Sequence, residues 1–169
     1  MTTSPHRLLS LKTKVKYFPR EQSSMKQVGV IGSAYCGEEL YNTAYKVGQL
    51  LAKKGYILIN GGLGGVMEAS AKGARDAGGF VIGVIPFASK KEANRYCNAV
   101  IATNMGHARN MIIVHSSDAI IAVGGGYGTI SEMAIALKEG KKVVAISPEI
   151  RLPRLIVAES PEKAVEMVE

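Results

Sequence analysis

The sequence predicts one α/β domain built on a doubly wound parallel sheet of about six strands, with helices on both faces. Residues 27–169 alternate short, β-rich apolar runs with longer amphipathic stretches, a pattern typical of parallel strands joined by crossover helices. The short runs are apolar on both faces, as expected of strands that helices cover on both sides. A chain of 169 residues, 47% of them hydrophobic, also suits a single domain with a sizeable core.

Each expected element follows from its local pattern. Short β-rich apolar runs predict strands at 28–31, 56–59, 80–85, 100–103, 119–123 and 143–146. Apolar residues at helical spacing predict helices at 38–54, 66–77, 107–115 and 129–139. Ser160 followed by Pro161 predicts the N-cap and first position of a closing helix through Val168. Elements in this order indicate a Rossmann-like fold.

Positive charge is concentrated at the N-terminus. The formal net charge is +7, but residues 1–26 hold six Lys or Arg against one Glu, whereas residues 27–169 hold fifteen basic residues against thirteen acidic ones. The sequence therefore divides into a basic N-terminal tail, 1–26, and a Rossmann-like ligand-binding domain, 27–169. A nucleic-acid-binding fold carries its basic stripe on the folded surface, so nucleic acid is disfavoured as a partner.

Composition favours a soluble, cytoplasmic protein. Cys36 and Cys97 are expected to be reduced thiols, since a domain of this size needs no disulfide. The longest apolar runs, such as 119–123, are far shorter than the roughly 20 residues of a membrane span. We therefore predict no membrane association. The three histidines are scattered and no His or Cys pair has ligand spacing, so no metal site is predicted.

Glycine-rich loops follow the first, second and fifth predicted strands, where a doubly wound sheet places its ligands. Glycine allows positive φ and close approach, so that backbone N–H groups can converge on an anion. The loops predict a phosphate-bearing ligand, although glycines also serve tight strand-to-helix turns. The candidate ligand-binding residues are Gly32, Ser33, Gly61, Gly62, Gly64, Gly65, Gly125, Gly126, Tyr127, Gly128 and Thr129.

Two common phosphate-binding classes are disfavoured by what the loops lack. A P-loop needs Lys and then Ser or Thr after its glycines, and neither Gly65 nor Gly128 is followed by such a pair. NAD binding expects a defined glycine spacing after the first strand and an acidic residue at the end of the second, where this chain has Asn60. We therefore expect neither nucleoside triphosphate hydrolysis nor an NAD cofactor.

Four motifs carry a family resemblance. GGLGGVM at 61–67, GVIP at 83–86, GHARN at 106–110 and GGYGTISE at 125–132, in this order, resemble the Lonely Guy superfamily over about residues 27–147. That superfamily includes phosphoribohydrolases that release the base from cytokinin nucleoside 5′-monophosphates, members labelled lysine decarboxylase, and the molybdenum cofactor carrier proteins. The resemblance also implies a homodimer or a larger homo-oligomer.

The resemblance to the hydrolases implies that Arg109 and Glu132 are the catalytic pair. Cleavage of an N-glycosidic bond builds positive charge on the sugar, so a carboxylate such as Glu132 can stabilise the transition state or activate water. Arg109 would hold phosphate or sugar with its fork of donors. Plainer alternatives remain open: Thr129 and Glu132 are spaced as a capping box, and Arg109 could be a surface charge or a salt-bridge partner of Glu132.

Two departures from the hydrolase pattern leave the function open between an enzyme and a binding protein. Gly124 stands where the hydrolases have Pro, and Asn110 where they have Lys. The helix at 67–79, the Gly-x-Ala-Arg pattern at 106–109 and the compact length look closer to the molybdenum cofactor carriers. One hypothesis is a cofactor-free nucleoside 5′-monophosphate phosphoribohydrolase; the alternative is a non-catalytic carrier of a molybdopterin-type ligand or nucleotide. No motif supplies a Schiff-base lysine, so pyridoxal phosphate and decarboxylation are disfavoured.

Several other residues allow a functional and a plain interpretation. His107 is expected to be a polar or capping residue rather than a catalytic base, and Cys36 a small residue in a tight turn rather than a reactive thiol. Met105 and Met111 are expected to pack on a helix face or at a subunit contact. The polar interval 86–98 is irregular enough to be a mobile flap over the ligand.

Overall fold

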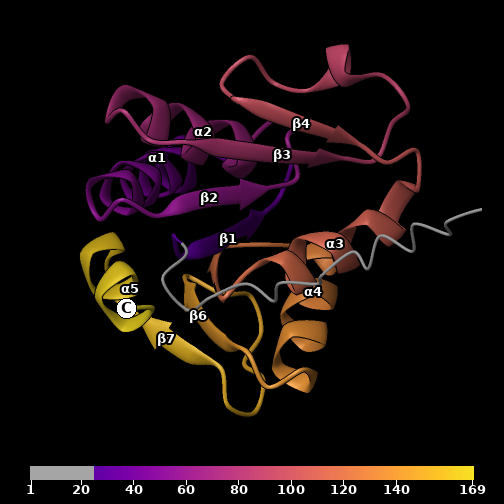
Figure 1. The fold of residues 1–169 in the computed structure, drawn as a ribbon. Helices are drawn as coiled ribbons and strands as arrows, with labels where there is room; N and C mark the ends of the chain where they lie inside the picture. The colour runs from indigo at the N-terminus through magenta and orange to yellow at the C-terminus, as the bar shows by residue number, and fades with distance from the viewer. Residues whose placement is uncertain (1–24) are drawn as a thin grey trace, which may run out of the picture.

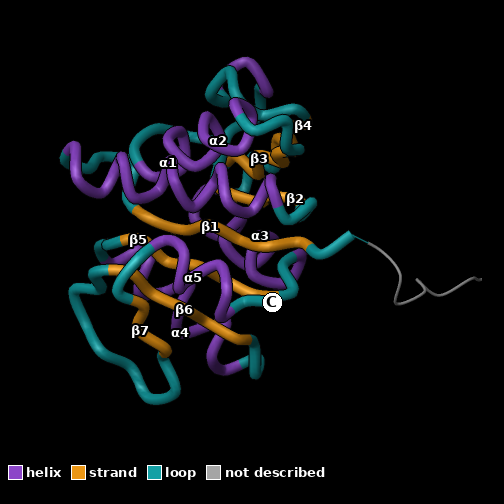
Figure 2. Tube along the Cα trace, turned by 90° about the vertical axis from the view of Figure 1, so that its left-hand side faces the viewer, coloured by secondary structure: helices purple, strands orange, loops and turns teal. Residues whose placement is uncertain are grey.

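A computed structural model describes residues 25–169 (Figures 1 and 2). The predicted basic tail, apart from Met25 and Lys26, lies outside the described residues. The strands are β1 (Gln27–Gly32), β2 (Ile57–Asn60), β3 (Val81–Ile85), β4 (Ala99–Ala102), β5 (Ala119–Val123), β6 (Lys142–Ile146) and β7 (Ile156–Ala158). The helices are α1 (Glu38–Lys53), α2 (Val66–Asp76), α3 (Arg109–Ser116), α4 (Tyr127–Lys138) and α5 (Pro161–Met167), with 3₁₀ turns at Lys90–Glu92 and Gly106–Ala108.

All strands pair in parallel in one sheet of order β4-β3-β2-β1-β5-β6-β7. The doubly wound prediction is confirmed, but the sheet has seven strands rather than about six. β7 has only three residues at the sheet edge, too few to produce a readable strand pattern. The strand order reverses direction at β1, which lies between β2 and β5, and this crevice is where such folds bind ligands.

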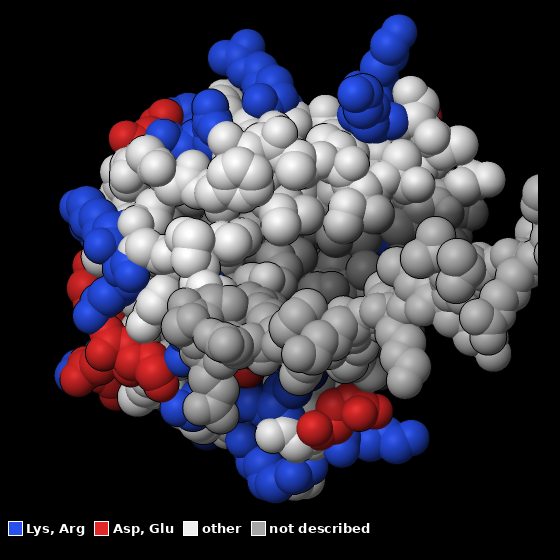
Figure 3. Space-filling model, viewed as in Figure 1, with Lys and Arg blue, Asp and Glu red and all other residues white. Residues whose placement is uncertain are grey.

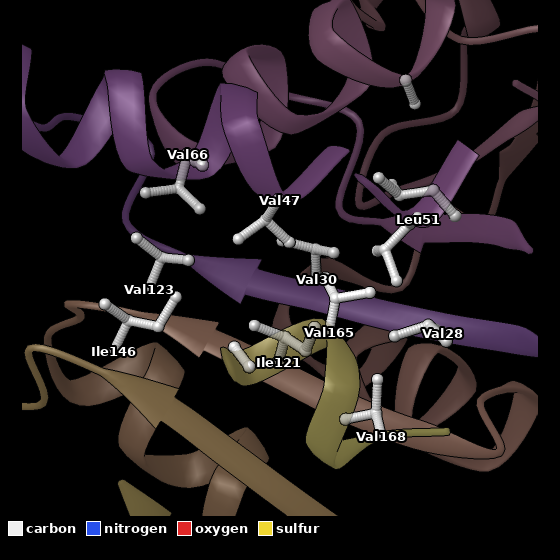
Figure 4. Packing of buried hydrophobic residues seen from close by; sticks show 14 of the residues in the cluster. Val28, Val30, Val47, Leu51, Val66, Ile121, Val123, Ile146, Val165 and Val168 are labelled. Carbon is white, nitrogen blue, oxygen red and sulfur yellow. The ribbon is translucent and has the colours of Figure 1, made fainter. Parts of the chain in front are cut away.

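The sheet separates two apolar layers. Helices α1, α2 and α5 contribute to the core on one face, which contains Val30, Val47, Val66 and Val165 (Figure 4). Helices α3 and α4 cover the opposite face through residues such as Ile113 and Met133. Strand β5, which pairs with the central strand β1, is buried along its whole length. The helices therefore pack on both faces of the sheet beneath the crevice. No described helix is long and apolar enough to cross a membrane.

Two helix starts differ from the sequence prediction, and both differences affect the site. α4 begins at Tyr127 with Gly126 as its N-cap, two residues before the predicted start. Thr129 and Glu132 are therefore the third and sixth helical residues, and the capping-box interpretation is wrong. The predicted helix 107–115 divides into the 3₁₀ turn Gly106–Ala108 and α3, so Arg109 opens α3. The predicted Ser160 cap of α5 is confirmed: its hydroxyl accepts from Lys163 N at 3.2 Å.

The segment 86–98, expected to be a flap, is attached to the β2–α2 loop near its C-terminal end. The N–H of Asn94 donates to Gly62 O at 2.8 Å, and its side-chain amide donates to Leu63 O at 2.9 Å. Asn98 Oδ1 then accepts from Val81 N at 2.8 Å beside β3. This part of the segment therefore braces the loop rather than hanging free beside it.

Helices α1 and α2 pack closely because glycines face backbone across their contact. A Cβ at Gly48 would overlap Ser70 O and lie 2.9 Å from Ala74 N, and one at Gly73 would overlap Tyr45 O. These contacts are with backbone atoms, which cannot move aside as a flexible side chain can.

We expect Gly48→Ala to lower the free energy of unfolding by about 1–3 kcal/mol, since over-packing forces the helices apart. The intrinsic helix preference for Ala acts in the opposite direction, so a loss would report the clash. Chemical denaturation of the variant checks this, with Asn42→Ala as control because it is an exposed change in the middle of the same helix. Equal stability of the two variants would contradict the close helix contact.

Candidate functional site

A pocket of about 460 Å³ lies at the carboxyl ends of β1, β2 and β5, beside the reversal of the strand order. It is bounded by the loop after β1, the loop after β2, the start of α3 and the start of α4. On the face shown in Figure 3, charged side chains lie mainly at the outer edge of the molecule, and the described middle of the face is largely uncharged. The lining residues are Val30, Ile31, Gly32, Ser33, Ala34, Tyr35, Gly61, Leu63, Met67, His107, Arg109, Asn110, Gly126, Tyr127, Gly128, Thr129 and Glu132.

The structure brings most of the predicted site residues into this one pocket. Both expected catalytic residues line it, and each of the three glycine loops contributes at least one predicted residue. The predicted residues in the lining are Gly32, Ser33, Gly61, Arg109, Gly126, Tyr127, Gly128, Thr129 and Glu132. The three turns therefore adjoin one another, as an anion-binding arrangement requires.

Four predicted ligand-binding glycines are not in the lining: Gly62, Gly64, Gly65 and Gly125. Gly62, Gly65 and Gly125 have positive φ, and a side chain at each would meet Ile85, the Ser33–Ala34 backbone or Thr129. A Cβ at Gly64 would lie 3.0 Å from Ala34 O. Turn geometry and close packing explain these glycines, which is the plainer of the two interpretations.

The prediction missed eight lining residues, which carry weaker sequence signals. They come from the end of β1, from side chains between the glycines, and from positions beside Arg109. Met67 and Asn110 belong to the recognisable motifs, so their positions in those motifs were the available signal. The eight are Val30, Ile31, Ala34, Tyr35, Leu63, Met67, His107 and Asn110.

The residues given plain interpretations have mixed outcomes. His107 lines the pocket, and no side chain caps its 3₁₀ turn, so the capping interpretation is wrong. Burial raises the pKa of the Cys36 thiol, which disfavours a reactive thiolate there. Met105 directly precedes the 3₁₀ turn, and Met111 lies on the outer side of α3. Both side chains are exposed, so neither is packed in the core of the described domain. No residue of segment 86–98 lines the pocket.

The start of α4 presents backbone donors to the pocket. Gly126, the N-cap, provides no side-chain acceptor, and the first helical hydrogen bond runs from Ile130 N to Gly126 O at 3.0 Å. The N–H groups of Tyr127, Gly128 and Thr129 therefore have no partner within residues 25–169. α5, which lies away from the pocket, instead has the Ser160 side-chain cap. Free amides at the positive end of a helix are suited to bind an anion.

Arg109 and Glu132 are both buried in the pocket wall, with only 8% and 6% of their surface exposed. Burial excludes the interpretation of Arg109 as a surface charge. A salt bridge is also excluded, because among the described residues no Arg109 nitrogen lies within 4.0 Å of a Glu132 oxygen. Arg109 Nε, fully enclosed, has no hydrogen-bond partner there either. Buried charges without partners are costly and rare in structural roles.

Burial also alters the ionisation of the pair. Removal from water raises the pKa of Glu132 from 4.5 to about 7, against the opposing effect of the Arg109 charge. The same burial lowers the pKa of Arg109, which the Glu132 charge partly offsets. At neutral pH the carboxyl group is divided between its acid and its ionised form, so it can either give or take a proton.

The raised pKa predicts that the protein loses stability as pH rises from about 4.5 through 7, because over that interval only the folded state holds the Glu132 proton. The loss attributable to Glu132 is about 3 kcal/mol. Unfolding by urea at pH 4.5–8.5 should give a flatter curve for Glu132→Gln than for the wild type. Glu139→Gln, an exposed change at the end of the same helix, should leave the slope intact. Parallel curves for all three proteins would contradict the raised pKa.

Two proteins with similar sequences match different shares of this chain. An uncharacterized protein of Archaeoglobus fulgidus is 60% identical over 141 residues, which cover 83% of this chain and 93% of that protein. The cytokinin riboside 5′-monophosphate phosphoribohydrolase of Mycobacterium tuberculosis is 34% identical over 119 residues, 65% of this chain and 64% of the enzyme. The similarity thus spans less than two thirds of that enzyme's length.

A solved structure and a family model each match most of this chain. The molybdenum cofactor binding protein of the phototrophic bacterium Rippkaea orientalis superimposes with a TM-score of 0.82 at 35% identity, covering 86% of this chain and 96% of that one. The family model of the SLOG cluster4 family matches residues 25–169, the whole of the described domain. The chain therefore belongs to the SLOG cluster4 family, in the Lonely Guy superfamily that its motifs resemble.

Proposed function

We propose that this protein binds a nucleoside 5′-monophosphate and hydrolyses its N-glycosidic bond, releasing the free base and ribose 5-phosphate. The observation that carries the proposal is the pair Arg109 and Glu132, two ionisable groups buried in the pocket wall that form no ion pair with each other or with any other of residues 25–169. Such groups are costly to bury, and a polar ligand between or beside them would offset that cost.

The start of α4 is the proposed phosphate site. The free N–H groups of Tyr127, Gly128 and Thr129 and the helix dipole together favour a dianionic group. Ser33 lies on the facing loop, and its Oγ is 4.0 Å from the Cβ position of Gly126. A phosphate held here directs the ribose along α4 toward Glu132, which lies beyond the first turn of the same helix.

Glu132 and Arg109 have complementary roles in the proposed reaction. The bond between C1′ and the base nitrogen breaks, and its electron pair leaves with the base. The ionised Glu132 stabilises the positive charge that develops on the ribose ring and accepts a proton from the attacking water, whose oxygen bonds to C1′. The proton is then transferred to the base, so that the charges balance. Arg109 orients the sugar and phosphate with its donors.

A non-catalytic carrier is the second candidate, and two observations favour it. The similarity to the Rippkaea protein, which binds molybdenum cofactor, covers 96% of that chain, against 64% of the mycobacterial hydrolase. Asn110 also lines the pocket where the hydrolases have Lys, so the site has one cation fewer. In this reading the same helix amides would hold the phosphate of a molybdopterin-type ligand, and the ligand would leave unchanged.

Base release from AMP, CMP, GMP and UMP distinguishes the two candidates. We expect the wild-type protein to release a free base, detected by chromatography, from at least one monophosphate but not from the corresponding nucleoside. Glu132→Gln should lower the rate by at least about 100-fold, the range for loss of a general base. Glu139→Gln should retain the wild-type rate. Tight retention of a pterin ligand, with no release from any monophosphate, would support the carrier instead.

The proposed reaction should also depend on pH. Because ionised Glu132 is the active form, kcat/KM should rise about tenfold per pH unit between about pH 6 and 7 and level off above pH 7. Below about pH 6 the rise should be steeper, because the substrate phosphate also loses its dianionic form there. Initial rates from pH 5 to 8.5 at constant ionic strength check the profile. A rate that is flat across pH 7, or that falls as pH rises from 5 to 7, would be incompatible with a carboxylate base at Glu132.

A further inference from the structure

The residue behind the Arg109 guanidinium is a glycine whose backbone does not require one. Gly61 is absent from the positive-φ glycines, so a side chain is compatible with its conformation. A Cβ at Gly61 would, however, overlap Arg109 Nη1 and lie 2.9 Å from Cζ and 2.5 Å from Met67 Sδ. The missing side chain therefore makes the space that the guanidinium occupies.

Gly61 is held in place by its neighbour Asn60, which is fully buried at the end of β2. Its side-chain amide donates to Met67 O at 2.7 Å and to Ser70 Oγ at 3.2 Å, and its Oδ1 accepts from Gly62 N at 2.8 Å. These bonds join the loop after β2 to the first turns of α2. These bonds hold the backbones of Gly61 and Met67 relative to each other, beside the space that the guanidinium occupies.

Packing is what places the Arg109 guanidinium. It has no ion pair within 4.0 Å among the described residues, and its enclosed Nε has no hydrogen-bond partner there. Since neither an ion pair nor a bond to Nε fixes it, its position follows from the wall that it lies against. A change in that wall should move the charge.

We infer that Asn60 and Gly61 form a seat that positions Arg109 relative to Glu132, and that Gly61 serves this purpose rather than phosphate binding. Both are positioning residues, because they act through Arg109. The effect on turnover rests on the proposed hydrolase function, whereas the effect on the Arg109–Glu132 pair is a property of the protein alone.

Gly61→Ala tests the seat sharply, since the atoms it would strike are the ends of two flexible side chains and the fold can adapt. Displacement of Arg109 changes its distance from Glu132 and therefore the charge interaction that lowers the pKa of Glu132. The midpoint of the Glu132-dependent change in unfolding free energy should shift by about half a pH unit or more, upward if the guanidinium moves away from the carboxyl group and downward if it moves closer. The control Gly37→Ala should leave the midpoint unchanged. In an Arg109→Ala background, Gly61→Ala should cause no further shift.

Each outcome decides the inference. An unshifted midpoint in a folded Gly61→Ala variant would overturn it, as would an equal shift with and without Arg109. If Gly61→Ala alone unfolds, the Gly61→Ala/Arg109→Ala and Gly61→Ala/Met67→Ala double variants separate the two clashes. Recovery of stability only on removal of the Met67 side chain would overturn the seat, whereas recovery on removal of the Arg109 side chain supports it. Because these measurements use no ligand, absence of base release by the wild type would reject the hydrolase and leave the seat standing. Where base is released, Gly61→Ala should lower kcat at least about tenfold.

Discussion

The site depends on the burial of two opposite charges, Arg109 and Glu132, at the one place in the sheet where the connections reverse direction. Their burial raises the free energy of the ionised forms, and direct contact does not relieve it. Such an arrangement persists only where rigid surroundings hold both groups. The fully buried strand β5 and the two helix layers provide that rigidity.

The glycines around the pocket divide into groups with different physical roles. Gly126 and Gly128 leave the first turn of α4 open, so that its N–H groups stay accessible. Gly62, Gly65 and Gly125 provide positive φ for the turns that bring the loops together. Gly61 makes room for another residue's side chain. A glycine-rich sequence can therefore indicate a pocket at the strand ends even though half of the predicted glycines do not line it.

The two candidate functions use the same phosphate-binding end and differ at Glu132. A carrier needs donors that hold an anion, which the start of α4 supplies. Hydrolysis needs, in addition, a carboxyl group able to exchange a proton near neutral pH beside the sugar. Binding alone requires neither a carboxyl group buried in the pocket wall nor its raised pKa, and these two properties are the basis of the proposed hydrolysis.

Local pattern was enough to predict the elements of the fold, because strand runs such as 119–123 are buried on both faces and helices such as α1 have one apolar side. The resemblance to the hydrolases, rather than local pattern, pointed to Arg109 and Glu132, and both line the pocket. Tertiary structure alone decided that β7 joins the sheet edge, that Thr129 and Glu132 lie inside α4, and which glycines face the pocket. Those features depend on contacts between distant segments, such as Gly61 against Arg109, and a linear pattern does not record which side of a loop meets a distant residue.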